Sequence, residues 1–200
     1  MPRSSARTRK NILDAGYTLF RRKGFTRVSM DDIAAAARLT KRTLYYHFKS
    51  KDELLTAVFA AQHELAFAAF RTFGDQLVGS PDAIIDTMFR DLAVWADTPR
   101  WAGSGFTRLV VELADLRGHP ARAVARRHKA LLEQHLAEVL DRAHVPEPRE
   151  RAREIWLLSE GAISLMLVHG DRKYAAAAAA AAKRLLKGPG LRHRRDKNTT

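Results

Sequence analysis

Apolar residues recur along this 200-residue chain at the spacing of amphipathic helices, and no stretch alternates in the manner of a half-buried strand. Glycines, prolines and short polar clusters separate the helical stretches. Helices are expected at about 8–23, 30–37, 41–46, 51–73, 82–96, 104–116, 120–144, 148–169 and 173–187. The pattern therefore predicts an all-α protein.

Capping residues mark the starts of three helices near the N-terminus. Ser29 with Asp32 has the spacing of a capping box, and so has Ser50 with Glu53. Thr40 can cap the short helix between them. The inward faces of the two short helices are expected to hold Ile33, Ala34, Ala37 and Leu44, and that of the long fourth helix Leu54, Leu55, Val58, Gln62, Leu65, Ala66, Ala69 and Phe73.

Basic residues gather at the two ends of the chain. Residues 1–50 hold 12 Lys and Arg against 3 Asp and Glu, and residues 183–200 hold 7 against 1. The residues between them hold 16 against 18. A local positive field of this kind is typical of proteins that bind a polyanion, with a charge that only aids solubility as the alternative.

The composition excludes several classes of protein. A hydrophobic share of 46% is enough for a real core. The absence of cysteine excludes disulfides and thiolate metal sites. No signal-type apolar stretch follows the N-terminus, and no segment approaches about 18 uninterrupted apolar residues. We expect a globular protein of the cytoplasm.

Residues 26–54 read TRVSMDDIAAAARLTKRTLYYHFKSKDEL. The segment holds in order a capping serine, an Asp-Ile-Ala run, a short helix ending in aromatic residues, and a lysine that opens the next helix: Ser29, Asp32-Ile33-Ala34, Thr43-Leu44-Tyr45-Tyr46-His47-Phe48 and Lys51-Asp52-Glu53-Leu54. This combination resembles the signature of the TetR family of bacterial helix-turn-helix regulators, over about residues 8–55. The remainder resembles the family only in length, helicity and general arrangement.

The resemblance implies that the helix beginning after Thr40 enters the major groove of DNA. Base-edge candidates on its outer side are Lys41, Arg42, Thr43 and Tyr46. Phosphate-contact candidates are Ser29, Thr40, Tyr45, His47 and Lys51. For Tyr45 and Tyr46 the alternative is ordinary packing in a small core, and for Lys41 and Arg42 it is a solvated face.

One position departs from the pattern, because Arg38 stands where the family usually has glycine in the turn. Glycine tolerates a positive φ without a Cβ penalty. If the turn keeps the left-handed conformation, Arg38 costs about 1 kcal/mol. The same side chain is also placed to contact a phosphate.

The segment 155–168 is apolar almost all round, so one partner helix inside a monomer does not cover it. The resemblance implies that the last two helices form a four-helix dimer interface, and a two-fold dimer suits two half-sites on DNA. Interface candidates are Ser159, Gly161, Ala162, Ser164, Leu165 and Ala178. The alternative is a central helix buried within a monomer.

Large apolar and aromatic residues with a few polar neighbours recur along the central helices, and such residues line ligand pockets. The candidates for binding an effector are His63, Phe67, Met88, Phe89, Trp95, Trp101, Phe106, His128 and Trp156. Plain core packing is the alternative for each of them. The effector is expected to be apolar or aromatic.

No catalytic motif is evident, since the serine-hydrolase, phosphate-loop and dinucleotide patterns are missing and His63-Glu64 lacks the second histidine of a zinc motif. His128 and His135 share a helix face, which permits a metal site, but solvated or core histidines explain them equally. We therefore expect no enzyme, no metal and no cofactor. Besides a sequence-specific regulator and an enzyme, a third interpretation is a protein that coats DNA without sequence preference.

The sequence thus predicts a homodimeric transcription regulator that binds a palindromic operator, is nucleoid-associated when bound, and has no contact with membranes. Residues 1–50 are expected to bind DNA, residues 51–187 to bind ligand and dimerise, and residues 188–200 to form a disordered basic tail. By resemblance the protein is a repressor that a small-molecule effector releases from DNA, through higher affinity for a non-binding state. Activation remains open.

Overall fold

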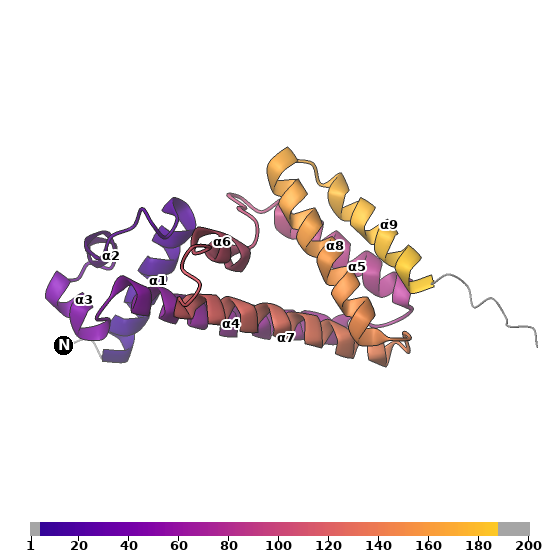
Figure 1. The fold of residues 1–200 in the computed structure, drawn as a ribbon, viewed down its shortest axis with the longest axis horizontal. Helices are drawn as coiled ribbons and strands as arrows, with labels where there is room; N and C mark the ends of the chain where they lie inside the picture. Colours follow the sequence, from indigo (N-terminus) through magenta and orange to yellow (C-terminus); the bar gives the residue numbers. More distant parts are fainter. Residues whose placement is uncertain (1–4, 188–200) are drawn as a thin grey trace, which may run out of the picture. The chain divides into compact units, whose positions relative to one another are not determined.

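The structure of the protein is a computed structural model, and it describes residues 5–187. Every regular element among these residues is a helix (Figure 1). The helices are α1 (Ser5–Lys23), α2 (Met30–Ala36), α3 (Lys41–His47), α4 (Lys51–Gln76), α5 (Pro81–Ala96), α6 (Gly105–Glu112), α7 (Pro120–Arg142), α8 (Pro148–His169) and α9 (Lys173–Lys187). The predicted all-α class is confirmed. The tail expected at 188–200 lies outside the described residues. Within 5–187 no helix is long and apolar enough to cross a membrane.

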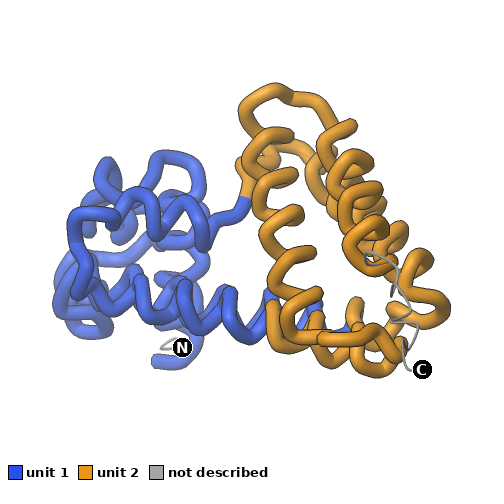
Figure 2. The backbone as a smooth tube through the Cα atoms, turned by 45° about the vertical axis from the view of Figure 1, so that its right-hand side comes forward, with its two compact units in different colours: residues 1–72, 104–132 blue, residues 73–103, 133–200 orange. Residues whose placement is uncertain are grey.

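The helices form two compact units (Figure 2). Over the described residues, unit 1 comprises 5–72 and 104–132, and unit 2 comprises 73–103 and 133–187. This division differs from the one expected at residue 50, because Phe106 and Leu109 of α6 belong to the same buried cluster as the N-terminal helices. Both α4 and α7 contribute to each unit.

The core of unit 1 holds the three N-terminal helices together. Ile12 of α1, Ile33 of α2 and Leu44 of α3 are fully buried, as are Phe48 and Leu54 at and after the end of α3. The inward faces predicted for the two short helices are confirmed by the burial of Ile33, Ala34, Ala37 and Leu44. α3 is therefore held through one side and leaves its other side to solvent.

Side-chain caps fix where α2, α3 and α4 begin. The capping box of α2 is complete: the N–H of Asp32 donates to Oγ of Ser29 (3.1 Å), and the N–H of Ser29 donates to Asp32 (2.8 Å). Thr40 caps α3. At α4 the N–H of Glu53 donates to Oγ of Ser50, but the Glu53 carboxylate accepts from the backbone N–H of Lys49. A capping box at Ser50 requires the N–H of Ser50 itself, so the second bond of the predicted box is made one residue earlier.

The turn between α2 and α3 has the left-handed geometry that glycine favours. Arg38 has φ +54°, its N–H donates to the carbonyl of Ala35 (3.0 Å), and the N–H of Leu39 donates to that of Ala34 (2.9 Å). These two bonds make a Schellman helix end with Arg38 at its C′ position. They satisfy the last carbonyls of α2 and impose about 1 kcal/mol of strain on Arg38.

In unit 2, α8 packs against α9 and α5, and its two faces differ sharply. One face is buried in the unit and consists of Ala152, Ile155, Ser159, Ala162 and Met166. The opposite face is exposed and consists of Leu157, Gly161, Ser164, Leu165 and Val168. The interface roles expected for Ser159, Ala162 and Ala178 are therefore wrong, because these three side chains are buried against their own unit.

Unit 2 also contains a close approach of α4 to α7 that depends on Gly74. A Cβ built on Gly74 would lie 2.2 Å from Nε2 of the buried His135. We expect Gly74→Ala to lower the free energy of unfolding by about 1–3 kcal/mol, as overpacking does. Denaturant unfolding of Gly74→Ala, His135→Ala and the double variant checks this, because removing the imidazole should abolish the cost of the added methyl group. A simple sum of the two single effects would contradict it.

Candidate nucleic-acid interface

The outward side of α3 presents aromatic and basic side chains to solvent. Tyr46 is 82% exposed and Tyr45 41% exposed, whereas Leu44 and Phe48 are buried. The ring of Tyr46 meets that of His47 edge-on at 5.3 Å, and His47 is half-buried. Packing in the core, the alternative considered for Tyr46, does not occur. A large aromatic side chain held this far into solvent on a short, well-anchored helix is unusual and indicates a contact surface.

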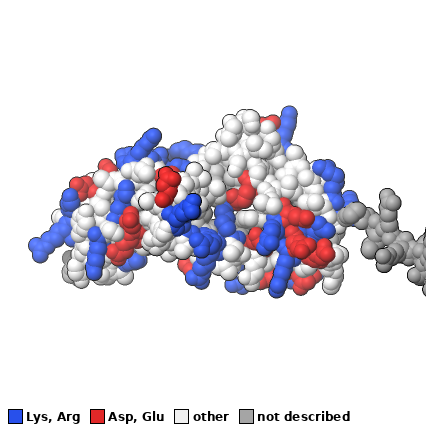
Figure 3. Space-filling model, viewed as in Figure 1, with Lys and Arg blue, Asp and Glu red and all other residues white. Residues whose placement is uncertain are grey.

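The two cations at the start of α3, Lys41 and Arg42, differ in whether they form an ion pair. Lys41 pairs with Asp31 at 3.0 Å, and this hydrogen bond holds the pKa of Lys41 above its ordinary value. Both side chains are exposed, so the pair contributes little stability and can be exchanged for another anion. Arg42 is exposed. On the face drawn in Figure 3, Lys and Arg side chains spread over the region of α2 and α3 with a few acidic ones between them.

The three hydroxyl candidates are already engaged in helix caps. The Ser29 hydroxyl accepts from the Asp32 N–H and donates to the Asp32 carboxylate (2.7 Å). The bonds that this carboxylate accepts from the hydroxyl and the backbone N–H of Ser29 lower the pKa of Asp32. Thr40 and Thr43 share a hydrogen bond between their hydroxyls (2.8 Å). These side chains set the first turns of α2 and α3, so any contact they make with DNA is added to that role.

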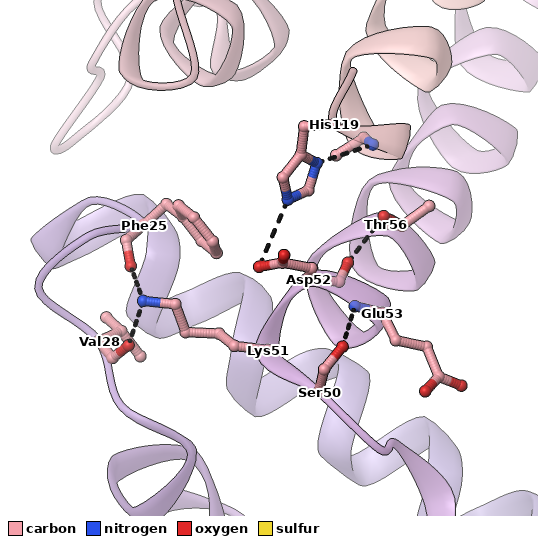
Figure 4. Close-up of polar contacts among 9 residues, drawn as sticks. Phe25, Val28, Ser50, Lys51, Asp52, Glu53, Thr56 and His119 are labelled. Carbon is pink, nitrogen blue, oxygen red and sulfur yellow. Dashed lines mark hydrogen bonds and ion pairs between the residues drawn. The ribbon is translucent and has the colours of Figure 1, made fainter. Parts of the chain in front are cut away.

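Lys51 is directed into the protein, as Figure 4 shows. Its Nζ donates to the carbonyls of Phe25 and Val28, each at 3.0 Å, and lies 4.2 Å from the centroid of the Phe25 ring. Two of its three N–H donors thus hold the loop between α1 and α2. The phosphate contact expected for Lys51 does not fit this geometry, and Lys51 has no part in the interface proposed below.

The same loop is held by α6 and by His119, just before α7, whose ring meets that of Phe25 edge-on at 5.9 Å. The N–H of Phe25 donates to the Glu112 carboxylate (2.5 Å). Nδ1 of His119 accepts from the N–H of Ala121 (3.1 Å), which caps α7, and its Nε2 lies 3.4 Å from Asp52 (Figure 4). Sequence reasoning missed these residues, because Phe25 and Glu112 are 87 positions apart and no local pattern connects them.

The effector candidates fall into two groups. Four of them form a chain of rings in unit 1: Phe67 stacks on His63 (5.6 Å), Nδ1 of His63 lies 3.0 Å from Nδ1 of His128, and His128 stacks on Phe106 (3.7 Å). Burial, with smaller effects of Lys129 and His63, lowers the pKa of His128 to about 4. The imidazole of His128 is therefore neutral near pH 7.

The other five candidates belong to unit 2. Met88 and Phe89 lie in its buried core, with Trp156 and Trp101 at the margin of that core. Trp101 meets Trp95 edge-on at 5.4 Å, and the Arg172 guanidinium lies 5.0 Å from the Trp101 ring. The indole N–H of Trp101 is buried and has no hydrogen-bond acceptor among the described residues. The effector candidates are thus divided between the two units.

The two histidines considered for a metal each have their own partner. His128 faces His63, and Nδ1 of His135 lies 3.2 Å from Oε2 of Glu138. Among residues 5–187 no group of three or more His, Cys, Asp or Glu side chains is arranged to hold a metal ion.

Residues 12–58 match the family model described as bacterial regulatory proteins, tetR family. Among curated proteins, the transcriptional regulator UidR of Escherichia coli K12 is 39% identical over 64 residues, which cover 32% of this chain and 33% of UidR. AcrR of Shigella flexneri is 39% identical over 51 residues, covering 26% of this chain and 24% of AcrR. The match thus spans a third or less of these relatives' length.

Solved structures match over most of the described chain. SCO4454, a TetR-family transcriptional regulator of Streptomyces coelicolor, superposes with a TM-score of 0.78 at 22% identity and covers 90% of this chain and 94% of its own. Reduced NemR of E. coli gives 0.77 at 18% identity, covering 88% and 96%. These likenesses concern the fold, and the N-terminal match concerns the sequence. The N-terminal segment 12–58 is thus similar in sequence to the tetR family of bacterial regulatory proteins, and the fold of the described residues is that of TetR-family structures.

Proposed function

We propose that this protein regulates transcription by binding a specific DNA sequence through α3. The observation that carries the proposal is the arrangement of α3 itself. Thr40 caps its start, Leu44 anchors its inner side, and Arg42 and Tyr46 project from its outer side into solvent. An anchored helix with exposed polar and aromatic side chains fits the major groove, where each base pair presents its own pattern of donors and acceptors.

The exposed side chains of α3 divide into those expected to contact bases and those expected to contact phosphates. Arg42 has the geometry to bind a guanine edge through two N–H groups, and Lys41 reaches the DNA once it leaves Asp31. Tyr46 and Thr43 complete the base-edge set. Tyr45 and His47, with the caps Ser29 and Thr40, contact phosphates on either side.

The protein acts as a homodimer through the exposed face of α8, here called the α8 stripe: Leu157, Gly161, Ser164, Leu165 and Val168. Apart from the adjoining backbone of α8, no atom of residues 5–187 lies within 4 Å of a Cβ built on Gly161, so a second helix can approach the backbone there. Ala176, Ala177 and Ala180 make a similarly smooth exposed face on α9. A two-fold dimer presents two copies of α3 and therefore favours a palindromic operator.

The proposed output is repression relieved by a small apolar or aromatic molecule. The aromatic chain of Phe67, His63, His128 and Phe106 supports an effector site, because planar rings and the neutral imidazole of His128 suit such a ligand. An effector with higher affinity for a state that does not bind DNA shifts the population away from the operator. Thermal stabilisation of the protein by candidate aromatic compounds tests this part separately.

Selection of bound duplexes from a random DNA pool at near-physiological salt tests the main proposal. We expect enrichment of a motif with two-fold symmetry. Tight binding without enrichment would instead assign the protein to the class that coats DNA without sequence preference. A motif without two-fold symmetry would contradict the dimeric arrangement.

Arg42→Ala should relax the preference at one base pair of each half-site while leaving the others unchanged. The lost contact is expected to weaken binding to the selected duplex roughly 10- to 100-fold per half-site. Repeating the selection with the variant, and measuring its affinity for the wild-type motif, checks this. Lys49→Ala is a matched control, because it removes an exposed cation just beyond α3. An unchanged motif from Arg42→Ala would exclude base reading by Arg42.

A further inference from the structure

The side chain of Arg38 is fixed in place by its backbone and left exposed. Both hydrogen bonds of the Schellman end pass through Arg38 and Leu39, so the left-handed φ of +54° is set by the end of α2. Leu39 is half-buried and packs against the core of unit 1. The Cα–Cβ direction of Arg38 is therefore as well defined as that of a residue inside a helix, two positions before Thr40.

Arg38 also differs from its neighbours in charge pairing. The segment 29–48 contains three cations, Arg38, Lys41 and Arg42. Lys41 is paired with Asp31. Arg38 is exposed and has no hydrogen bond, ion pair or ring contact from its guanidinium to any residue within 5–187. An unpaired guanidinium on a rigid turn is available to an anion and loses little conformational freedom of the backbone when it binds one.

We propose that Arg38 binds a phosphate of the DNA backbone beside the groove that α3 enters. This inference rests on the proposed function. A guanidinium suits a phosphate because its planar N–H groups match two phosphate oxygens. The contact fixes the register of α3 without reading a base, so it strengthens binding to every sequence alike.

The experiment compares Arg38→Gln and Arg38→Lys with the wild type, on the duplex that the wild type enriches from a random pool and on a random duplex of equal length. Gln keeps the Cβ and removes the charge, whereas Lys keeps the charge. The slope of log K against log salt is negative, and for Arg38→Gln we expect its magnitude to decrease by about 0.9 per bound protomer, on both duplexes. The affinity should fall about tenfold at low salt, and Arg38→Lys should restore most of the slope.

Arg100→Gln is the matched control. Arg100 is likewise an exposed arginine at positive φ (+60°) with no partner among the described residues, but it lies in unit 2. Its loss changes the net charge equally and should leave the slope unchanged. A slope that Arg38→Gln leaves at the wild-type value, or that Arg100→Gln lowers as much, would overturn the proposal. Failure of the wild type to enrich any motif would instead count against the proposed function, and the random duplex still reports on Arg38.

Discussion

Replacing Leu157 and Val168 together by aspartate is expected to turn the proposed dimer into a monomer. The two side chains are 69% and 72% exposed and lie on the α8 stripe, one near each end. In a dimer joined through this stripe, four carboxylates would enter an apolar contact without partners. The desolvation of a buried charge costs several kcal/mol, so the dimer dissociation constant should rise by roughly 100-fold or more.

Sedimentation velocity at several protein concentrations measures this change, with circular dichroism to show that the helices are retained. The double variant Leu65→Asp/Val78→Asp is a matched control, because these residues are 67% and 78% exposed but belong to neither α8 nor α9. The control should remain dimeric. A Leu157→Asp/Val168→Asp protein that sediments as the wild type would place the dimer contact elsewhere. Loss of affinity for the selected duplex should accompany the monomer, since each half-site would then be bound alone.

Acidification from pH 7 to pH 4 should destabilise the protein by about 3 kcal/mol through His128 alone. Burial lowers the pKa of His128 to about 4, against an ordinary value of 6.5. The unfolded chain therefore takes up a proton below pH 6.5 that the folded chain takes up only near pH 4. The stability that depends on a neutral His128 is complete above pH 6.5 and is lost as the pH falls through this window.

Urea unfolding at pH 7, 6, 5 and 4 measures the loss. Carboxylates titrate in the same range, so the informative quantity is the difference between the wild type and His128→Leu, whose stability should fall less steeply. His144→Gln is the control, because His144 is an exposed histidine at the end of α7. Equal pH dependence in the wild type and His128→Leu would show that His128 does not titrate in this way.

The sequence predicted the helices well because helix ends have local causes. The caps at Ser29 and Thr40, the prolines that begin α5, α7 and α8, and Gly170 at the end of α8 all act within a few residues. α6 is the exception, since it ends at Glu112 rather than near residue 116. There Leu113 turns into the core of unit 1, a tertiary contact that no local pattern reveals.

Faces and partners were harder to predict, because periodicity indicates a stripe without identifying what covers it. On α4 the expected stripe is wrong in its middle part, because Leu65, Ala66 and Ala69 are exposed and His63 is buried, whereas Phe73 packs against the core of unit 2 as expected. The buried side chain of His63 has its hydrogen-bond partner in His128, which lies 65 positions away in the sequence, so no local pattern indicates it. The segment 155–168 was recognised as apolar on all sides, but only the structure separates the face buried in the monomer from the α8 stripe.

Lys51 shows the same limit for a candidate binding residue. Its position at the start of α4 predicted a phosphate contact, but its ammonium group donates hydrogen bonds to the carbonyls of Phe25 and Val28 instead. Tyr46 and Arg42 were identified correctly as outward residues, because Leu44 alone determines which side of the short α3 faces inward.

Unit 1 is formed by two separate stretches of chain, residues 5–72 and 104–132. This determines which fragments of the protein can contain its complete core. The core around Phe20 and Phe25 continues into Phe106 and Leu109 of α6, into Leu113 just after it, and into Ala121 of α7. A fragment that stops near residue 50 or residue 72 would leave these apolar surfaces uncovered and would lose the Glu112 carboxylate that holds Phe25. A hybrid protein made by joining unit 1, the proposed DNA-binding unit, to a foreign domain should therefore include residues 104–132, which requires two junctions in the gene rather than one.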